Sequence, residues 1–216
     1  MRVGILGSGE VGRRLADGFI ELGHQVKIGS RDPNQSKISE WINKHDKEKA
    51  SSGTFADTAT FGELVVLATL WEGTAHAIQL ANSKNLAEKI VIDVTNPLDF
   101  SKGMPPSLAV GHTDSAGEII QRMLPDSKVV KAFNIVGNPH MIHPDFPGGK
   151  PSMFICGNDE RAKKFVTEDI LSKFGWETID IGMIEGSRLL EPLALLWILQ
   201  YFRTGSGNHA FKLLRK

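Results

Sequence analysis

The sequence predicts an α/β fold in which a doubly wound parallel sheet is followed by a small helical part at the C-terminus. Three observations support this class. Short apolar runs alternate with segments of helical periodicity along the whole chain. The run Leu64-Val65-Val66-Leu67-Ala68 has no polar side chain, as is typical of a parallel strand buried on both faces. The first apolar run ends in a glycine-rich turn that leads into a helix, which is how a βαβ unit begins.

The predicted strands are the short apolar runs, because each is bounded by glycine, proline or polar residues. They cover Arg2–Leu6, Gln25–Gly29, Leu64–Leu70, Ile90–Val94, Lys128–Phe133, Met153–Cys156 and Glu177–Ile181. A weaker strand pattern occurs at Gly53-Thr54-Phe55. Since helical segments separate most of these runs, we expect right-handed crossovers between parallel neighbours.

The predicted helices are segments in which apolar residues recur every three or four positions. They cover Val11–Leu22, Gln35–Lys47, Thr74–Ala81, Ser115–Met123, Glu160–Phe174 and Arg188–Phe202. Two longer segments, Pro97–Val110 and Gly137–Ser152, are rich in proline or glycine and are expected to be irregular loops. Both follow strands, and ligands in open α/β sheets bind beyond the carboxyl ends of strands.

The composition argues against several classes of protein. The 216 residues carry 25 Lys and Arg against 25 Asp and Glu, so no charge excess indicates a nucleic acid or membrane partner. Cys156 is the one cysteine, which excludes an intramolecular disulfide, and we predict no metal site. The longest apolar stretch, Leu189–Phe202, is too short and too interrupted to span a bilayer. Because the first strand begins at Arg2, we expect no signal peptide and a cytoplasmic location.

The most informative segment is Gly7-Ser8-Gly9-Glu10-Val11-Gly12, a G-x-G-x-x-G pattern between the first strand and the first helix. Gly7 permits a tight turn, Gly9 lets a pyrophosphate approach the backbone, and Gly12 lets helix and strand pack closely. The helix N-terminus adds free N–H groups and the positive end of its dipole. This pattern predicts a Rossmann-type dinucleotide-binding domain. We expect residues 1–157 to form that domain and residues 158–216 to pack on it.

The end of the second strand predicts which dinucleotide binds. Ser30 stands where NAD enzymes carry Asp or Glu, and Arg31 follows it. A hydroxyl can donate to a 2′-phosphate and a guanidinium can pair with it, whereas a carboxylate would repel it. We therefore predict NADP rather than NAD. Asp32 leaves an alternative open, because its carboxylate can neutralise Arg31 or Lys37.

Five motifs follow one another along the chain: Gly7-x-Gly9-x-x-Gly12, Gly29-Ser30-Arg31, Leu70-Trp71-Glu72, Asp93-x-Thr95-Asn96-Pro97 and Lys131-Ala132-Phe133-Asn134. Together they resemble the NADPH-dependent F420 reductase family, which includes the archaeal F420H2:NADP oxidoreductases and is related to the reductase domains of STEAP metalloreductases. The resemblance extends over almost the whole chain. It implies a Rossmann domain with a small C-terminal part, NADP(H) as cofactor, and hydride exchange between the nicotinamide and a flavin or deazaflavin (F420) ring.

The resemblance also implies roles for particular residues. These are Ser8, Gly9, Glu10 and Val11 for the pyrophosphate, Ser30 and Arg31 for the 2′-phosphate, Thr69, Leu70 and Trp71 for the path from adenine to nicotinamide, Thr95, Asn96 and Pro97 near the nicotinamide ribose, and Asn134 and Gly137 at the ring-stacking site. Holding two rings together needs little acid–base chemistry. We therefore assign no catalytic residue, and Asn134 is the one candidate, through a hydrogen bond to the nicotinamide or the acceptor ring.

Two other functions fit the same sequence: a reductase of small carbonyl or imine compounds, and an NADP(H)-binding sensor or regulatory protein without turnover. Carbonyl and imine reductases need a proton donor, and no His or Lys has an obvious position for that role. Their substrate domain is usually larger than the segment of about 60 residues after Gly157. An assay of NADPH oxidation separates the three functions. Turnover with a flavin-like acceptor indicates the first, turnover only with carbonyl or imine compounds indicates the second, and binding without turnover indicates a sensor.

For several side chains the sequence allows more than one interpretation. Trp71 forms a wall of the cofactor cleft or covers the edge of the sheet. Lys131 faces solvent or an internal carboxylate. Arg188 and Glu191 stand three residues apart at a helix start, a spacing that allows an ion pair. Cys156 is expected to be a buried packing residue rather than a nucleophile.

The last predicted helix, Arg188–Phe202, is apolar on nearly every side. Such a helix is either buried or part of a subunit interface, and we predict a homodimer formed through it. The following Gly205-Ser206-Gly207-Asn208-His209 can turn the C-terminus back over the ring site or over a partner subunit.

Overall fold

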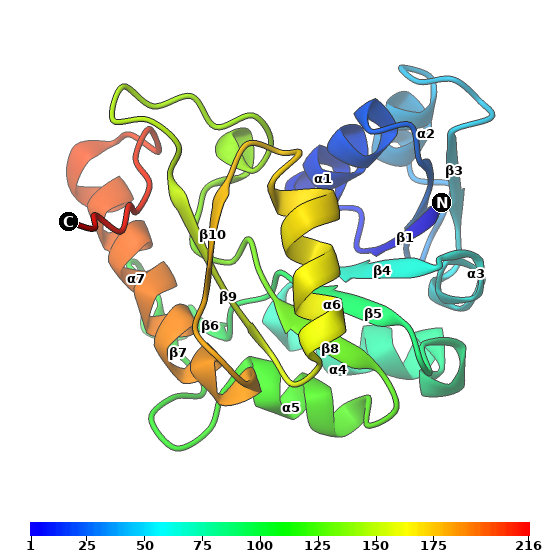
Figure 1. Cartoon of the computed structure of the whole chain (residues 1–216). Helices are drawn as coiled ribbons and strands as arrows, with labels where there is room; N and C mark the ends of the chain where they lie inside the picture. Colours follow the sequence, from blue (N-terminus) through cyan, green and yellow to red (C-terminus); the bar gives the residue numbers. More distant parts are fainter.

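Eight strands form one central sheet in the computed structural model, which describes residues 1–216. Their order across the sheet is β10-β9-β8-β5-β4-β1-β2-β3 (Figure 1). The strands are β1 Arg2–Leu6, β2 Gln25–Gly29, β3 Ala50–Gly53, β4 Leu64–Leu67, β5 Ile90–Asp93, β8 Lys128–Lys131, β9 Ser152–Gly157 and β10 Glu177–Asp180. The chain winds outward from β1 to β3 and then starts again at β4. The switch point between β1 and β4 is the place where ligands bind in open α/β sheets.

Helices cover both faces of the sheet, which confirms the predicted doubly wound α/β class. They are α1 Glu10–Glu21, α2 Ser36–Ile42, α3 Phe55–Phe61, α4 Trp71–Ala81, α5 Ala116–Met123, α6 Glu160–Phe165 and α7 Ser187–Thr204. Side chains of α1, α2 and α6 belong to one hydrophobic cluster, and those of α3, α4 and α5 belong to a second. The sheet separates the two clusters.

Strand β4 explains why a continuous apolar run is needed in the middle of such a sheet. Leu64 and Val66 point into the first cluster, whereas Val65 and Leu67 point into the second. All four are almost fully buried. Successive side chains of a strand face opposite sides, so a strand covered on both faces has no position for a polar residue.

The sheet is mostly parallel, with one exception at its C-terminal side. Strands β1, β2, β3, β4, β5 and β8 run parallel to one another, whereas β9 runs antiparallel to β8. No crossover helix separates β8 from β9, so the loop between them brings the chain back in the opposite direction, which an antiparallel pair allows. Strand β10 then lies parallel to β9 after α6.

The weak strand pattern at Gly53-Thr54-Phe55 is wrong beyond its first residue. Gly53 ends β3, and Thr54 is the N-cap of α3. The Thr54 hydroxyl accepts from the Asp57 backbone N–H at 3.1 Å, and the Asp57 carboxylate accepts from the Thr54 N–H at 3.0 Å. This reciprocal capping box starts a helix that strand propensity conceals.

Other boundaries differ from the sequence prediction. Strand β4 stops at Leu67, and α4 begins at Trp71 rather than Thr74. The predicted helix after Gln35 is shorter, ending at Ile42, and α6 continues into a π-helical segment, Val166–Leu171. The loop that follows Pro97 contains a small hairpin of β6 Leu98–Asp99 and β7 Ser107–Leu108.

Candidate dinucleotide site

The glycine-rich turn between β1 and α1 is tightly packed at two glycines and open at the third. Gly7 has φ of +128°, and a Cβ there would overlap the carbonyl oxygen of Ala68. A Cβ on Gly12 would overlap the Gly7 carbonyl oxygen. Nothing lies within 4 Å of the Cβ position of Gly9, which is exposed at the N-cap of α1. The turn therefore leaves free space at Gly9, where a phosphate can reach the backbone.

The N-terminus of α1 has the features of an anion site. No side chain caps it, so the first N–H groups of this helix lack a side-chain acceptor. Arg13 folds back and donates from Nη1 to the Ser8 carbonyl oxygen at 2.7 Å, which fixes the turn. Glu10 is exposed and accepts from Asn138 Nδ2 at 3.3 Å, and this contact links the turn to the loop that begins at Gly137.

The end of β2 presents Ser30 and Arg31 differently. Ser30 is nearly buried, and its Oγ accepts from Gln35 Nε2 at 3.2 Å. Arg31 is exposed and has no ion pair. Asp32 accepts from the Asn34 backbone N–H at 3.0 Å and pairs with neither Arg31 nor Lys37. The alternative in which Asp32 neutralises the basic side chains is therefore not the one that the molecule adopts.

The segment after β4 holds an exposed apolar side chain beside the switch point. Leu70 is 82% exposed and is the N-cap of α4. Thr69 Oγ1 lies 2.8 Å from Thr74 Oγ1, which donates to the Leu70 carbonyl oxygen at 3.0 Å. Trp71 is partly buried against the second hydrophobic cluster. These contacts favour the interpretation in which Trp71 covers the core. Leu70 is the more exposed of the two side chains.

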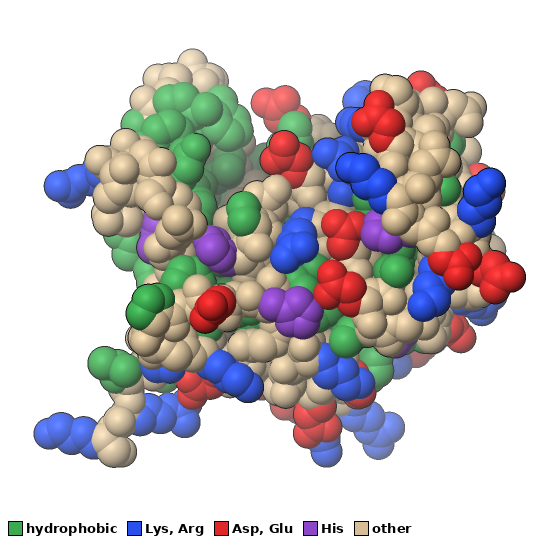
Figure 2. Space-filling view, turned by 90° about the horizontal axis from the view of Figure 1, so that it is seen from above, with side chains coloured by type: hydrophobic (Ala, Val, Ile, Leu, Met, Phe, Trp, Pro, Cys, Tyr) green, Lys and Arg blue, Asp and Glu red, His purple; other side chains and the backbone are tan.

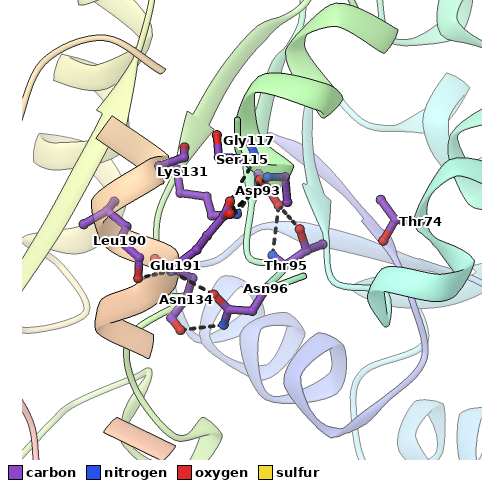
Figure 3. Close-up of polar contacts among 12 residues, drawn as sticks. Thr74, Asp93, Thr95, Asn96, Ser115, Gly117, Lys131, Asn134, Leu190 and Glu191 are labelled. Atoms are coloured by element: carbon purple, nitrogen blue, oxygen red, sulfur yellow. Dashed lines mark hydrogen bonds and ion pairs between the residues drawn. The ribbon is translucent and has the colours of Figure 1, made fainter. Parts of the chain in front are cut away.

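The ends of β5 and β8 are joined by an amide pair (Figure 3). Asn96 Nδ2 donates to the Asn134 carbonyl oxygen at 2.8 Å, and Asn134 Nδ2 donates to Asn96 Oδ1 at 3.0 Å. Asn134 Nδ2 also donates to the Leu190 carbonyl oxygen of α7 at 3.0 Å. Asn134 is 5% exposed, and its Oδ1 has no hydrogen-bond partner. Pro97 follows Asn96 and accepts from the Ala109 N–H at 2.7 Å, which holds the hairpin in place.

Behind Thr95 lies a buried ionic cluster of Asp93, Lys131 and Glu191, which are 0%, 0% and 1% exposed (Figure 3). Lys131 Nζ lies 2.9 Å from Asp93 Oδ2 and 2.9 Å from Glu191 Oε1. Burial alone would lower the pKa of Lys131, but Asp93 and Glu191 together raise it above its ordinary value. Lys131 therefore faces internal carboxylates and not solvent, which settles the two interpretations that the sequence allows.

The predicted Arg188–Glu191 pair is wrong. Arg188 makes a bidentate pair with Glu118 of α5, at 2.8 Å from Nε and 2.5 Å from Nη2. The Glu191 carboxylate faces the N-terminus of α5 instead, where it accepts from the Ala116 and Gly117 N–H groups at 3.0 Å each. Both acids thus bind α7 to α5.

The C-terminus folds back within the same chain toward the Gly137 loop. Gly205 ends α7 with a left-handed φ of +67°, and Trp197 Nε1 donates to the His209 carbonyl oxygen at 2.9 Å. Trp197 also lies where a side chain on Gly137 would be. His140 and Asn208 side chains join at 3.0 Å. The C-terminal turn therefore packs beside the loop that follows β8.

A cleft of about 650 Å³ opens between the hairpin and α7. Its walls include Leu108, His112, Arg188, Leu189 and Pro192. Leu189 directly precedes Leu190, whose carbonyl oxygen binds Asn134. The cleft therefore lies on the exposed side of the turn of α7 whose buried side binds Asn134.

Comparison with known proteins places the chain in a family. Residues 2–97 match the family model described as NADP oxidoreductase coenzyme F420-dependent. The F420-dependent NADP reductase of Methanocaldococcus jannaschii is 31% identical over 220 residues, which cover 96% of this chain and 96% of that protein. The chain belongs to this family of F420-dependent NADP reductases. It is thus an NADP-dependent oxidoreductase.

One solved structure and one further protein sequence are also similar to this reductase. A crystal structure from Arthrobacter sp. FB24, of a protein named as a candidate F420-dependent NADP reductase, superposes with a TM-score of 0.92 at 40% identity and covers 99% of both chains. Metalloreductase STEAP3 of Rattus norvegicus is 30% identical over 198 residues, but the chain spans only 37% of its length. No helix of the reductase combines the length and apolar character needed to cross a membrane.

The buried ionic cluster is the part of the site that sequence reasoning missed. Asp93 and Lys131 are direct partners in the register of β5 and β8. Two opposite charges at the ends of adjacent predicted strands could therefore have indicated an ion pair. Glu191 lies on a helix 60 residues away in sequence from Lys131, and local spacing pairs it with the wrong arginine. Contacts between distant elements decide its partner.

Proposed function

We propose that the reductase transfers hydride between NADP(H) and a flavin-like or deazaflavin ring, with F420 as the first candidate acceptor. The observation that carries the proposal is the match with an F420-dependent NADP reductase over nearly the full length of both chains. When bound, NADPH supplies the hydride. The residues of the reductase hold the two rings together and keep water out of the space between them.

The cofactor site that we propose runs along the switch point of the sheet. The free space at Gly9 and the uncapped N-terminus of α1 fit a pyrophosphate, which the N–H groups of Ser8, Gly9, Glu10 and Val11 bind. The unpaired guanidinium of Arg31, with Ser30 beside it, binds the 2′-phosphate. Thr69 and the exposed Leu70 border the path toward the nicotinamide, and Trp71 beside them covers the core.

At the ring end, the proposed residues are Thr95, Asn96 and Pro97 for the ribose and Asn134 and Gly137 for the ring. Asn134 Nδ2 already donates to two oxygens, which fixes the orientation of the amide. Its Oδ1 is a buried acceptor without a donor, a situation that costs about 1–3 kcal/mol. We propose that an N–H of the nicotinamide carboxamide or of the acceptor ring reaches this atom after the residues that cover it move aside.

The acceptor enters through the cleft between the hairpin and α7. Leu108, Leu189 and Pro192 give it apolar walls suited to a planar ring, and Arg188 and His112 provide polar contacts. The cleft and the amide pair contact the same turn of α7, at Leu189 and Leu190, and we propose that the ring extends from the cleft toward the amide pair.

A survey of acceptors tests the proposed function. Oxidation of NADPH is followed by absorbance with F420, FMN, FAD and a panel of ketones and cyclic imines. The proposal expects turnover with at least one of the three ring acceptors. Turnover with carbonyl or imine compounds alone contradicts it, and so does tight NADPH binding without any turnover, which is the behaviour of a sensor.

We also propose a homodimer formed through α7. Leu196 and Leu199 are exposed on this helix three residues apart, a spacing that places both side chains on one face of the helix. Figure 2 shows a group of hydrophobic side chains on the left of the molecule, the side on which α7 lies in Figure 1. A contiguous exposed apolar patch is typical of a protein interface.

Light scattering of the purified chain tests the dimer. The double substitution L196E/L199E is expected to convert a dimer to a monomer because it places four carboxylates in the interface. The matched control is L214E, since Leu214 is as exposed but lies outside α7. A monomeric wild type, or a double variant that stays dimeric, contradicts this proposal.

A further inference from the structure

The buried cluster of Asp93, Lys131 and Glu191 contains two carboxyl groups and one amine. Asp93 ends β5, Lys131 ends β8, and Glu191 lies on α7, so three elements meet at this point (Figure 3). The strands around the cluster are otherwise apolar. Buried ion pairs contribute little net stability compared with apolar residues of the same size, so a functional role is worth seeking.

The hydrogen bonds identify the charge of each group. Asp93 Oδ1 accepts from the Thr95 N–H at 2.9 Å and from Thr95 Oγ1 at 2.7 Å, and its Oδ2 accepts from Lys131. Glu191 Oε1 accepts from Lys131 and from the Gly117 N–H, and Oε2 accepts from the Ala116 N–H. Each carboxyl oxygen of Asp93 and Glu191 accepts at least one hydrogen bond. A protonated carboxyl group would instead need an acceptor for its own proton, so both groups are carboxylates. Two carboxylates and one ammonium leave a net charge of −1.

The neighbouring groups reduce this charge without cancelling it. The N-terminus of α5 contributes a partial positive charge of roughly one half at Glu191. Arg188 and Glu118 form a pair of zero net charge. Burial raises the pKa of the Cys156 thiol to about 11, so it is neutral. Burial also raises the pKa of Glu191, and the Lys131 ammonium and the two backbone N–H groups oppose that rise.

The cluster lies directly behind the turn that we assign to the nicotinamide end. Asp93 holds Thr95 by two hydrogen bonds, and Asn96 follows and pairs with Asn134. Loss of hydride turns the neutral dihydronicotinamide into a ring of charge +1, while the acceptor ring takes the hydride with its two electrons. A buried negative charge near this ring interacts with the oxidised form and not with the reduced form.

We propose that the Asp93–Lys131–Glu191 cluster selects the oxidised, positively charged nicotinamide over the reduced one and so favours hydride donation by NADPH. This inference rests on the proposed function, which places the nicotinamide at Thr95 and Asn134. As a general magnitude, two unit charges roughly 10 Å apart at an effective dielectric constant of about 20 interact by an energy that corresponds to about a tenfold change in affinity. Glu191 is the residue that gives the cluster its excess negative charge.

The test measures dissociation constants of NADP⁺ and NADPH by titration calorimetry for the wild type and two variants. In E191Q the cluster is neutral, and the ratio of the NADP⁺ constant to the NADPH constant is expected to rise by about fivefold to tenfold. In K131M/E191Q the net charge is −1 again, from Asp93 alone, and the ratio is expected to return to that of the wild type. A purely structural effect would be larger in the double variant and would weaken both ligands equally.

The control is E63Q, because Glu63 is an exposed carboxylate at the amino end of β4, whereas Asp93 and Lys131 lie at the carboxyl ends of their strands, and its removal should leave the ratio unchanged. Thermal unfolding reports whether each variant folds. An unchanged ratio in E191Q, or a double variant that stays shifted, overturns the inference. If E191Q does not fold, the wild type decides: tighter binding of NADP⁺ supports the inference, and tighter binding of NADPH overturns it. Failure of the wild type to bind either form contradicts the proposed function instead.

Discussion

Arg31 is the residue at which the preference for NADPH over NADH can be tested. Its guanidinium is exposed at the end of β2 and has no carboxylate partner, because Asp32 accepts from the Asn34 backbone instead. The Oγ of Ser30 beside it accepts from the Gln35 side-chain amide at 3.2 Å and from the Asp32 backbone N–H at 3.4 Å. An unpaired guanidinium is available for a 2′-phosphate, and a hydrogen bond to a charged group contributes about 1.5–3 kcal/mol.

For Arg31→Ala we expect the Michaelis constant for NADPH to rise on the order of tenfold to a hundredfold, while that for NADH changes little. Steady-state kinetics with both cofactors measures the ratio. Lys37→Ala is the matched control, because Lys37 is an exposed cation in the nearby α2. If the ratio of the two constants is the same in R31A and the wild type, Arg31 does not bind the 2′-phosphate.

Cys156 offers a second test at this scale. It is fully buried, and burial raises its pKa to about 11, although a contact with Ser187 Oγ at 3.3 Å opposes the rise. The thiolate is the reactive form, and it is nearly absent at pH 8. We expect no reaction of the native protein with a thiol reagent at pH 8 and reaction of one thiol after denaturation. Rapid labelling of the native protein would contradict the buried position of Cys156.

At the scale of elements, α3 shows how a local signal can be hidden. Thr54 and Asp57 form a reciprocal capping box, and the sequence around Thr54 also has the β-branched and aromatic residues of a strand. Thr54→Ala is expected to lower the free energy of unfolding by about 1 kcal/mol, and Thr54→Ser by much less. Urea unfolding of both variants measures the difference. Equal losses would mean that the cap does not stabilise α3.

The elements themselves divide into those that the sequence predicts and those that it does not. Strands β1 and β2 match their predicted ranges, because an apolar run between glycine or polar residues has few other structures available. The reversed direction of β9 and the hairpin β6–β7 lie in or after segments that the sequence marks only as loops. Chain direction depends on how a loop returns, and local periodicity carries no information on that.

At the scale of the whole molecule, the proposed site combines three distant parts of the chain. The glycine turn follows β1, the amide pair joins the ends of β5 and β8, and α7 closes this edge through Glu191 and Leu190. The motifs at strand ends are readable in the sequence because parallel strands bring their carboxyl ends together. The position of α7 is not readable, since its two buried contacts join residues far apart in the chain.

The measurement that tests the account most directly is a single-turnover experiment with NADPH deuterated at both C4 positions. The reductase is mixed with this cofactor and with F420, FMN or FAD, and reduction of the ring is followed by absorbance. Direct hydride transfer predicts that at least one ring is reduced, and that the deuterated cofactor reduces it more slowly than NADPH does. If no ring is reduced, or if the rate of reduction does not depend on deuterium, the central claim of hydride transfer to a flavin-like ring is contradicted.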